Sequence, residues 1–471
     1  MKRAIMVLIW AVLLHGMGYR ADTNAQTVKA TIKVGVGEMV ITPQKNMQMA
    51  GFARSQMSTG MHDDLHARSL VVEDAKGNSV VLMTIALVGL NEEYGKRIRD
   101  GITAKTGIPG DRIVVSCTHT HSGPSVGRGS SEDGKEYGNL LVERCVESAV
   151  KAWGSRVPGR IGIGKTEVFE LGRNRRYLLY GGIHPDPEAA VVKIEDAKGK
   201  LLGVAFNYGC HPSGLDWSNT LFSEDWPYYA IQGVKKSVGN EVWVAYYQSA
   251  EGNINVGYTA ELSAVGAEMP VRSYWYIEKK GNQMTDAVLK ALPTIKTSSD
   301  LTVNAAMGRF DYPLRDSYPI SLEQAEKDAE AAKAFLAALE KKPEFKGTRT
   351  LDKAKVEVFQ TSQRLGAAKR FYGNQNRPAT RSLEQQAVRI GDAVFVTFPG
   401  ELFSDIGLAI KKQSPMKKTF VIGVTCGPGG YLPAAKEFID GDYEVDGSSY
   451  SPKTEPVCIA SSLELIIKAA K

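Results

Sequence analysis

The sequence of 471 residues is 43% hydrophobic and 23% charged, a balance typical of an ordinary globular protein. Its formal net charge is +6, and its lysines and arginines form no dense tract and no nucleic-acid motif. These features exclude nucleic acid as an expected partner. Length alone allows about three domains at roughly 150 residues each. No linker divides the chain, however, so we expect one large domain.

The first residues are typical of a secretory signal peptide. Lys2-Arg3 is followed by an apolar stretch from Ala4 to Leu14, which is too short to span a bilayer comfortably. Thr23-Asn24-Ala25 offers a cleavage site, so we expect a leader over residues 1–25 and a mature domain over residues 26–471. No later stretch is long and apolar enough for a membrane span. We therefore expect export, to the periplasm or the extracellular space.

The first third of the chain alternates strand patterns with helical patterns. A helix is expected to begin at Asn91 and to be stopped by Gly107 and Pro109. The predicted strands cover residues 28–41, 69–73, 79–90 and 113–115, and a second helix covers residues 139–153. This alternation predicts an α/β fold with mixed β-sheets flanked by helices.

Apolar runs in the rest of the chain predict four more strands, at residues 201–208, 241–247, 393–398 and 419–425. Residues 321–342 form the clearest helical pattern. Ser321 and Gln324 make a capping box at its start, and Pro343 closes it. Its charged residues favour a solvated surface helix. The segment 343–380 is rich in Lys, Arg, Gln and Asn and supports no prediction.

The run from Ser116 to Pro124 places two histidines directly after a buried strand pattern. In an extended backbone His119 and His121 would point the same way, because side chains alternate with a period of two residues. Imidazole binds zinc through a neutral nitrogen and also moves protons near neutral pH. The two rings could therefore enter one pocket in different roles. The plainer alternative is a polar loop whose histidines form local hydrogen bonds.

Four candidate site residues lie in the same kind of place, namely a loop rich in Gly or Pro that follows an apolar, strand-like run. They are His119, His211, Glu401 and Tyr431. Ligand sites of α/β sheets form outside the carboxyl ends of strands, so these side chains could meet. Two histidines and one glutamate form a known catalytic zinc set that leaves room for water. Each residue could instead have a purely structural role, as a hydrogen-bonded histidine in a turn or as a glutamate that caps a helix.

The cysteines give a weaker signal. Cys117, Cys210 and Cys426 flank the same loops and could be zinc ligands, but small buried thiols at strand ends are common. Five cysteines do not describe a disulfide framework, although a single bridge stays open.

Ordered motifs along most of the mature chain resemble those of the neutral (non-lysosomal) ceramidases, zinc-dependent amidases that split ceramide into sphingosine and fatty acid. The most specific is Thr118-His119-Thr120-His121-Ser122-Gly123-Pro124. The others are Gly35-Val36-Gly37 with Ile41-Thr42-Pro43, Gly60 to Arg68, Asn174-Arg175, His211-Pro212, Ser223-Glu224-Asp225, Pro399-Gly400-Glu401, Gly430-Tyr431 and Tyr443 to Ser449.

The resemblance implies one Zn²⁺ per chain. The implied ligands are His119, His211, Glu401 and Tyr431. The resemblance also places His121 and Arg175 near the scissile amide, to polarise its carbonyl or to move protons. Asn255 stands where the family has a serine that has been discussed as catalytic. Asparagine cannot be a nucleophile, but it can donate a hydrogen bond to an oxyanion.

Two departures from the family leave the substrate more open than the metal. We expect no counterpart of the family's C-terminal immunoglobulin-like domain, and neither the helix at 321–342 nor the basic stretch after it aligns. Aromatic residues near the proposed site could line an apolar wall for a lipid, or could be packed core. They are Trp217, Phe222, Trp226, Tyr228 and Tyr229. The polar surroundings of the two tryptophans suit a sugar as well as a lipid.

We therefore expect a zinc-dependent amidohydrolase acting on a small N-acyl or lipid substrate, with ceramide as the first candidate. The alternatives are a deacylase of another N-acyl compound, such as an amino sugar or amino lipid, and a non-catalytic binding protein on this scaffold. A serine hydrolase fits less well, because no Gly-x-Ser-x-Gly elbow accompanies Ser122. The sequence does not define the oligomeric state.

Overall fold

The computed structural model describes residues 32–471 except 53, 55, 127–130, 260–271 and 375. Two β-sheets dominate the fold. One has eight strands in the order β11-β9-β8-β6-β1-β3-β4-β5, and the other has four in the order β13-β14-β15-β17. The predicted mixed α/β architecture is confirmed, while the predicted leader lies outside the described residues.

The large sheet consists of β1 (Ile32–Val40), β3 (His66–Glu73), β4 (Ser79–Ile85), β5 (Ile113–Cys117), β6 (Val157–Glu167), β8 (Glu188–Asp196), β9 (Leu201–Tyr208) and β11 (Trp243–Gln248). The small sheet consists of β13 (Val303–Pro313), β14 (Thr380–Ile390), β15 (Ala393–Thr397) and β17 (Lys418–Ile422). Short pairs join β2 (Gly60–Met61) to β10 (Leu221–Phe222), β7 (Arg173–Asn174) to β12 (Ile254–Asn255), and β16 (Glu401–Leu402) to β18 (Tyr431–Leu432). The helices are α1 (Glu92–Thr106), α2 (Glu132–Gly154), α3 (Trp226–Val238), α5 (Tyr274–Ala291), α6 (Leu322–Glu340), α7 (Arg349–Tyr372), α8 (Ser404–Gln413), α9 (Tyr443–Gly447) and α10 (Thr454–Ala470).

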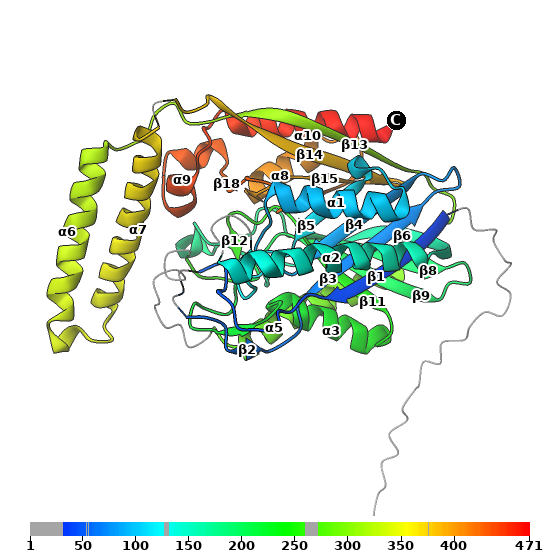
Figure 1. Ribbon diagram of the computed structural model, residues 1–471, viewed down its shortest axis with the longest axis horizontal. Helices are drawn as coiled ribbons and strands as arrows, with labels where there is room; N and C mark the ends of the chain where they lie inside the picture. The colour runs from blue at the N-terminus through cyan, green and yellow to red at the C-terminus, as the bar shows by residue number, and fades with distance from the viewer. Residues whose placement is uncertain (1–31, 53, 55, 127–130, 260–271, 375) are drawn as a thin grey trace, which may run out of the picture.

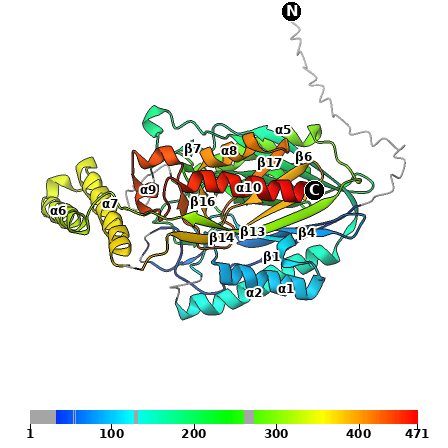
Figure 2. The same cartoon turned by 90° about the horizontal axis from the view of Figure 1, so that it is seen from above.

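The two sheets pack face to face, and helices cover both outer faces (Figures 1 and 2). In the core between the sheets, Val72 and Val192 of the large sheet share one buried cluster with Phe395 and Phe420 of the small sheet. Helices α1 and α2 cover one half of the large sheet, and α3 and α5 cover the other half. Helices α8 and α10 cover the small sheet. The result is a four-layer arrangement in which helices cover the outer face of each sheet.

The carboxyl ends of several strands lie close together because neighbouring strands run parallel. β4 and β5 are parallel, as are β9 and β11, and β15 and β17. Gln248, at the end of β11, donates from Nε2 to the carbonyl of Thr118 at 3.1 Å and so joins the two edges of the large sheet. A bridge between Ser116 and Thr425 ties the end of β5 to the segment after β17. The loops after β5, β9, β11, β15 and β17 therefore converge, and the sequence pattern predicted this for all of them except the loop after β11.

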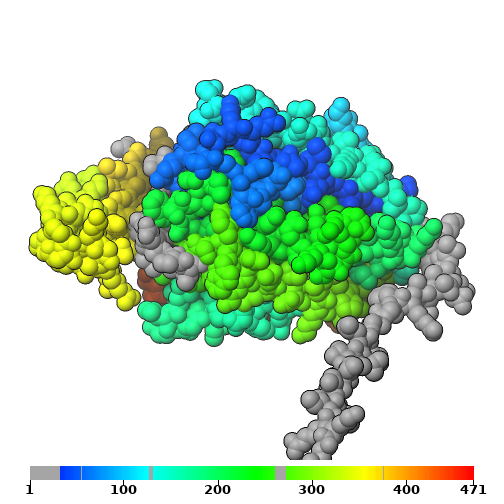
Figure 3. Space-filling view, turned by 90° about the horizontal axis from the view of Figure 1, so that it is seen from below, coloured from blue at the N-terminus to red at the C-terminus, as the bar shows by residue number. Residues whose placement is uncertain are grey.

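Helices α6 and α7 form a hairpin that projects from one end of the body (Figures 1 and 3). The predicted helix at 321–342 is confirmed, with the backbone N–H of Gln324 donating to Ser321 Oγ at 3.1 Å. The segment for which the sequence supported no prediction contains α7. The hairpin leaves from the end of β13 and returns at the start of β14, where the N–H of Leu314 donates to the carbonyl of Ala379 at 2.8 Å.

Some predicted boundaries are wrong. Helix α2 begins at Glu132, seven residues before the predicted start at 139, because Ser131 caps it and accepts from the N–H of Gly134. The strand predicted over 79–90 ends at Ile85, and the chain then turns into the site. All five cysteines are buried, and none forms a disulfide. Within the described part of the chain, no helix has the length and apolar character needed to cross a bilayer.

Candidate metal and active site

His119 lies two residues after β5 in a turn rather than in the extended backbone that the sequence predicted. Its φ of 70° is in the left-handed region, which only a few non-glycine residues occupy. Its N–H donates to the carbonyl of Leu87 at 2.9 Å, and its Nδ1 bonds the carbonyl of Val88 at 2.5 Å. Since Nδ1–H must be the donor to a carbonyl, Nε2 is left as a free acceptor. The strained turn thus fixes both the position and the tautomer of this ring.

His211 follows β9 and is fully buried. Its Nδ1 bonds the carbonyls of Ile254 at 2.8 Å and Glu251 at 3.1 Å, so its Nε2 is likewise left as an acceptor. Nε2 of His211 lies 3.1 Å from Oε2 of Glu401, and Nε2 of His119 lies 3.4 Å from the same oxygen. Two imidazoles that are oriented by backbone carbonyls and converge on one carboxylate match the usual surroundings of metal-binding histidines.

His121 completes a triangle of imidazoles. Its ring centre lies 5.1 Å from that of His119, 5.6 Å from that of His211 and 4.8 Å from that of Phe52. Neither of its ring nitrogens has a hydrogen-bond partner, although both are buried. Burial lowers the pKa of His121 well below its usual value, so the ring is neutral near pH 7. The main chain of this residue is held by Arg54, whose Nη1 donates to its carbonyl at 2.8 Å.

Glu251 belongs to the site, although the sequence analysis did not select it. It is fully buried after β11, and neither of its carboxylate oxygens has a hydrogen-bond partner. Burial, together with the negative charge of Glu401, raises the pKa of Glu251 well above its usual value. It follows an apolar strand in a polar loop with Gly252, which is the same signal that selected His119 and Glu401.

The donor groups fit a divalent cation. One nitrogen from each of His119, His121 and His211 lies within 4.8 Å of the others, and the same limit holds for ligand atoms of His119, Glu251 and Glu401. A cation would bind the Nε2 acceptors of His119 and His211 and offset the negative charge of the buried carboxylates, and neutral imidazole with carboxylate is the donor set that zinc-type ions take. Glu401 and Tyr431 are opposite each other in the β16–β18 pair, so the predicted fourth ligand lies beside the carboxylate. The thiols of Cys117, Cys210 and Cys426 belong to neither group.

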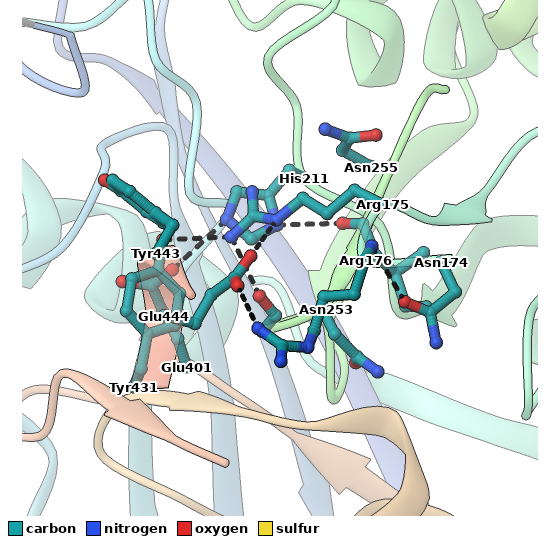
Figure 4. Close-up of polar contacts among 12 residues, drawn as sticks. Asn174, Arg175, Arg176, His211, Asn253, Asn255, Glu401, Tyr431, Tyr443 and Glu444 are labelled. Atoms are coloured by element: carbon teal, nitrogen blue, oxygen red, sulfur yellow. Dashed lines mark hydrogen bonds and ion pairs between the residues drawn. The ribbon is translucent and has the colours of Figure 1, made fainter. Parts of the chain in front are cut away.

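Arg175 is buried and held by three hydrogen bonds (Figure 4). Its Nε donates to Oε1 of Glu444 at 2.6 Å, and its Nη2 donates to the carbonyl of Gly252 at 2.9 Å and to the hydroxyl of Tyr431 at 3.1 Å. Arg176 donates to the other oxygen of Glu444 at 2.9 Å, so one buried carboxylate fixes two guanidinium groups. The structure therefore places the predicted Arg175 beside the predicted Tyr431.

Asn255 lies apart from this network (Figure 4). Its Oδ1 accepts from the N–H groups of Gly257 and Tyr258 at 2.9 and 3.2 Å, and its Nδ2 donates to the carbonyl of Tyr258 at 2.8 Å. Its amide thus stabilises the turn after β12, which leaves one N–H of Nδ2 for the predicted role as an oxyanion donor.

Part of the predicted aromatic wall is core instead. Trp226 is fully buried, and its Nε1 donates to the carbonyl of His211 at 3.3 Å, so it supports the site from behind. Phe222 is 2% exposed and belongs to the cluster under α1 and α2. Tyr228 and Tyr229 pack around His62 rather than around the three histidines. Trp217 is partly exposed, and its Nε1 is buried without a hydrogen-bond partner.

This geometry defines a class, namely an α/β protein whose strand ends converge on a candidate metal centre. Residues 32–255 match the family described as neutral/alkaline non-lysosomal ceramidase, N-terminal. The resemblance stated from the motifs is thereby confirmed.

Individual neutral ceramidases are also similar to this chain. The chain is 30% identical over 243 residues to the neutral ceramidase of Drosophila pseudoobscura pseudoobscura, over 44% of this chain and 32% of that protein. It is 26% identical over 253 residues to the neutral ceramidase of Pseudomonas aeruginosa, over 47% of this chain and 37% of that one. The match therefore spans about a third of the length of these relatives. The crystal structure of the P. aeruginosa neutral ceramidase is similar in fold, with a TM-score of 0.70 and 19% identity over 93% of this chain and 74% of that chain.

Proposed function

We propose that this chain is an exported, zinc-dependent amidohydrolase that splits ceramide into a sphingoid base and a fatty acid. The observation that carries the proposal is the convergence of His119 and His211 on Glu401, in a chain whose N-terminal half matches the ceramidase family. The residues that would hold the zinc are His119, His211, Glu401 and Tyr431. The ion would supply a Lewis acid that activates water at neutral pH.

The chain's own groups provide the remaining steps. His121 is neutral and has no protein partner at either nitrogen, so it accepts a proton from the attacking water. The water oxygen bonds to the carbonyl carbon, the C–N bond then breaks, and the proton passes to the leaving amine nitrogen. Arg175, fixed by Glu444, stabilises the negative charge that develops on the carbonyl oxygen.

The test combines metal analysis with turnover. Purified protein is supplied with zinc, freed of unbound metal and analysed for zinc content, and fatty acid release from a long-chain ceramide is then measured. One zinc per chain with release is expected. Zinc without turnover of any N-acyl compound would indicate a binding protein on this scaffold. If the protein holds no zinc, and added zinc changes neither stability nor activity, the site assignment is wrong.

Deacylation of a smaller N-acyl compound is the second candidate, favoured by the burial of Phe222 and Trp226. With these two rings in the core, the apolar wall near the site is shorter than the sequence suggested. The discriminating comparison sets release of fatty acid from short- and long-chain ceramides against release of acetate from N-acetylated amino sugars. Turnover of the sugars alone would place the chain outside ceramide chemistry.

Export rests on the sequence of the leader alone. Expression with the native N-terminus, followed by N-terminal sequencing of protein recovered outside the cytoplasm, should give a first residue near 26. Recovery of the full chain, with its leader, only from the cytoplasm would contradict export.

A further inference from the structure

A pocket of about 270 Å³ lies between helix α7, the start of β14 and the segment from Gly447 to Ser449. Four of the residues that line it are arginines, namely Arg315, Arg370, Arg377 and Arg381. No aspartate or glutamate of the described chain is among its lining residues, and none of the candidate metal ligands lines it. The pocket is thus a separate basic cavity between the helical hairpin and the main body.

The protein compensates the positive charge of this pocket only in part, through the electrostatic attraction between Asp446 and Arg315. Arg377 donates from Nη2 to the carbonyl of Asp316 at 2.9 Å, and Arg381 donates from Nη1 to the carbonyl of Pro428 at 3.4 Å. Arg315 donates from Nη2 to the carbonyl of Val445. These partners are main-chain oxygens, and among the residues that the structure describes no carboxylate forms an ion pair with any of the four arginines.

The neighbouring pocket, of about 420 Å³, shows the contrast. Arg364 lines it and is paired with Asp446 at 2.6 Å, and Asp440 and Asp442 also line it. Acidic side chains therefore balance the arginines on one side of Arg315 and are missing from the lining on the other side.

Four guanidinium groups around one small cavity repel one another, and any that becomes buried loses hydration, which is costly unless an anion compensates it. Arg315 shows this cost directly, because its Nε is buried without a partner and burial lowers its pKa. Guanidinium forks match the geometry of phosphate and similar oxyanions. Thr380 and Ser449 add hydroxyl groups to the lining.

We propose that this pocket binds a phosphate- or sulfonate-type oxyanion, either free in solution or as the head group of an anionic lipid. The pocket adjoins the catalytic region, since Ser448 lines it and donates from Oγ to the main-chain carbonyl of Tyr431 at 2.9 Å. Binding in the pocket does not depend on the hydrolytic function proposed above.

The first experiment titrates the full-length protein with inorganic phosphate by calorimetry, and follows the melting temperature against sodium chloride of equal ionic strength. Saturable binding and a rise in melting temperature with phosphate alone are expected. Sedimentation with vesicles of phosphatidylglycerol, against vesicles of phosphatidylcholine, tests the lipid source. Phosphate binding alone supports a free anion, and vesicle binding that phosphate competes away supports a head group.

Variants assign the binding to the pocket. Arg381→Ala and Arg370→Gln should each weaken phosphate binding on the order of tenfold, the value of one charged hydrogen bond. Arg349→Ala is the matched control, because Arg349 begins the same helix but does not line the pocket. Arg370 is exposed on α7, so its variant keeps the test available if Arg381→Ala does not fold.

Three outcomes would overturn the proposal. The first is the absence of binding to both phosphate and the anionic vesicles. The second is binding that survives unchanged in Arg370→Gln and Arg381→Ala. The third is an equal loss in Arg349→Ala, which would show that only the overall positive charge is sensed.

Discussion

Arg364 of α7 donates from Nε to Oδ2 of Asp446 at 2.6 Å and so ties the helical hairpin to the α9 segment. One residue earlier, Gln363 donates from Nε2 to the carbonyl of Tyr443 at 3.3 Å. The ring of Phe359 also stacks on Tyr443, with centres 5.8 Å apart and an angle of 18° between planes. Because Glu444 follows Tyr443 and fixes Arg175, the hairpin supports a predicted catalytic residue through α9.

Arg364→Ala should therefore lower kcat by roughly tenfold, with little change in KM, because small displacements of positioned groups are costly for catalysis. Arg364 is about a third exposed, so its ion pair contributes little to global stability. Arg364→Lys should restore part of the loss, and Lys353→Ala, on the exposed face of α7, serves as the control. Steady-state kinetics together with urea unfolding separate the two effects. A loss of kcat that only mirrors lost stability would refute the positioning role.

The histidines should separate into two roles. His119→Ala and His211→Ala are expected to lose most bound zinc, since each removes an Nε2 that faces Glu401. His121→Ala should keep the metal and lose 10²- to 10⁴-fold in turnover, the usual cost of removing a proton-transfer group. Metal content and rates measured on the same preparations check both statements. If His121→Ala loses zinc as fully as His119→Ala, the roles assigned here are wrong.

Asn255 provides a test of the serine alternative. Since its amide stabilises a turn, Asn255→Ala should lower the free energy of unfolding by about 1 kcal/mol per lost hydrogen bond and reduce turnover less than tenfold. Asn255→Asp, which keeps the Oδ1 acceptor, is the matched variant for the turn. No acyl adduct should form on any serine. Mass spectrometry of a stalled reaction would detect one, and its presence would replace water attack by a covalent mechanism.

His184 should make the protein sensitive to acid. It is buried, its Nδ1 accepts from the N–H of Asp186, and its Nε2 bonds the carbonyl of Gly209. Burial lowers the pKa of His184 from 6.5 to about 4. The neutral ring therefore stabilises the fold fully above pH 6.5. That contribution, about 3 kcal/mol, is lost as the pH falls through 4.

The measurement is the free energy of unfolding of wild type and His184→Gln between pH 7 and pH 4. The glutamine does not titrate, so wild type should lose more stability than the variant over this range. Parallel pH profiles would show that His184 does not differ in protonation between the folded and unfolded states. The difference between the two proteins isolates the contribution of His184 from that of every other ionisable group.

The sequence predicted the grouping of His119, His211, Glu401 and Tyr431 because strand ends leave a pattern, namely an apolar run followed by Gly or Pro. That pattern holds in the structure at every one of these loops. The left-handed turn at His119 was missed, because the extended conformation assumed for a residue after a strand gives no hint of a turn. The same pattern also includes Glu251, which was not predicted as a site residue; a carboxylate in a polar loop usually faces solvent, whereas this one is buried.

Helix α7 escaped prediction for a different physical reason. It buries few residues, and those are small or polar, namely Ala354, Thr361, Ala367 and Ala368. Such a helix has no broad apolar stripe to mark it. The contacts made by Arg364 and Gln363 join segments about 80 residues apart, and no local pattern predicts such pairs.

The hairpin leaves and re-enters the small sheet at hydrogen-bonded neighbours, Leu314 and Ala379. Because the two ends of this insertion are hydrogen-bonded to each other, a tight turn can replace it without disturbing the register of β13 and β14. The appendage can therefore be exchanged without altering the loops that carry the metal donors, and its effect on the site passes through the α9 contacts. Replacing residues 315–378 with a two-residue turn would leave the donor groups in place while removing Phe359, Arg364 and three of the four pocket arginines together. Relatives with different hairpins could then share one reaction centre and differ in what they recognise around it.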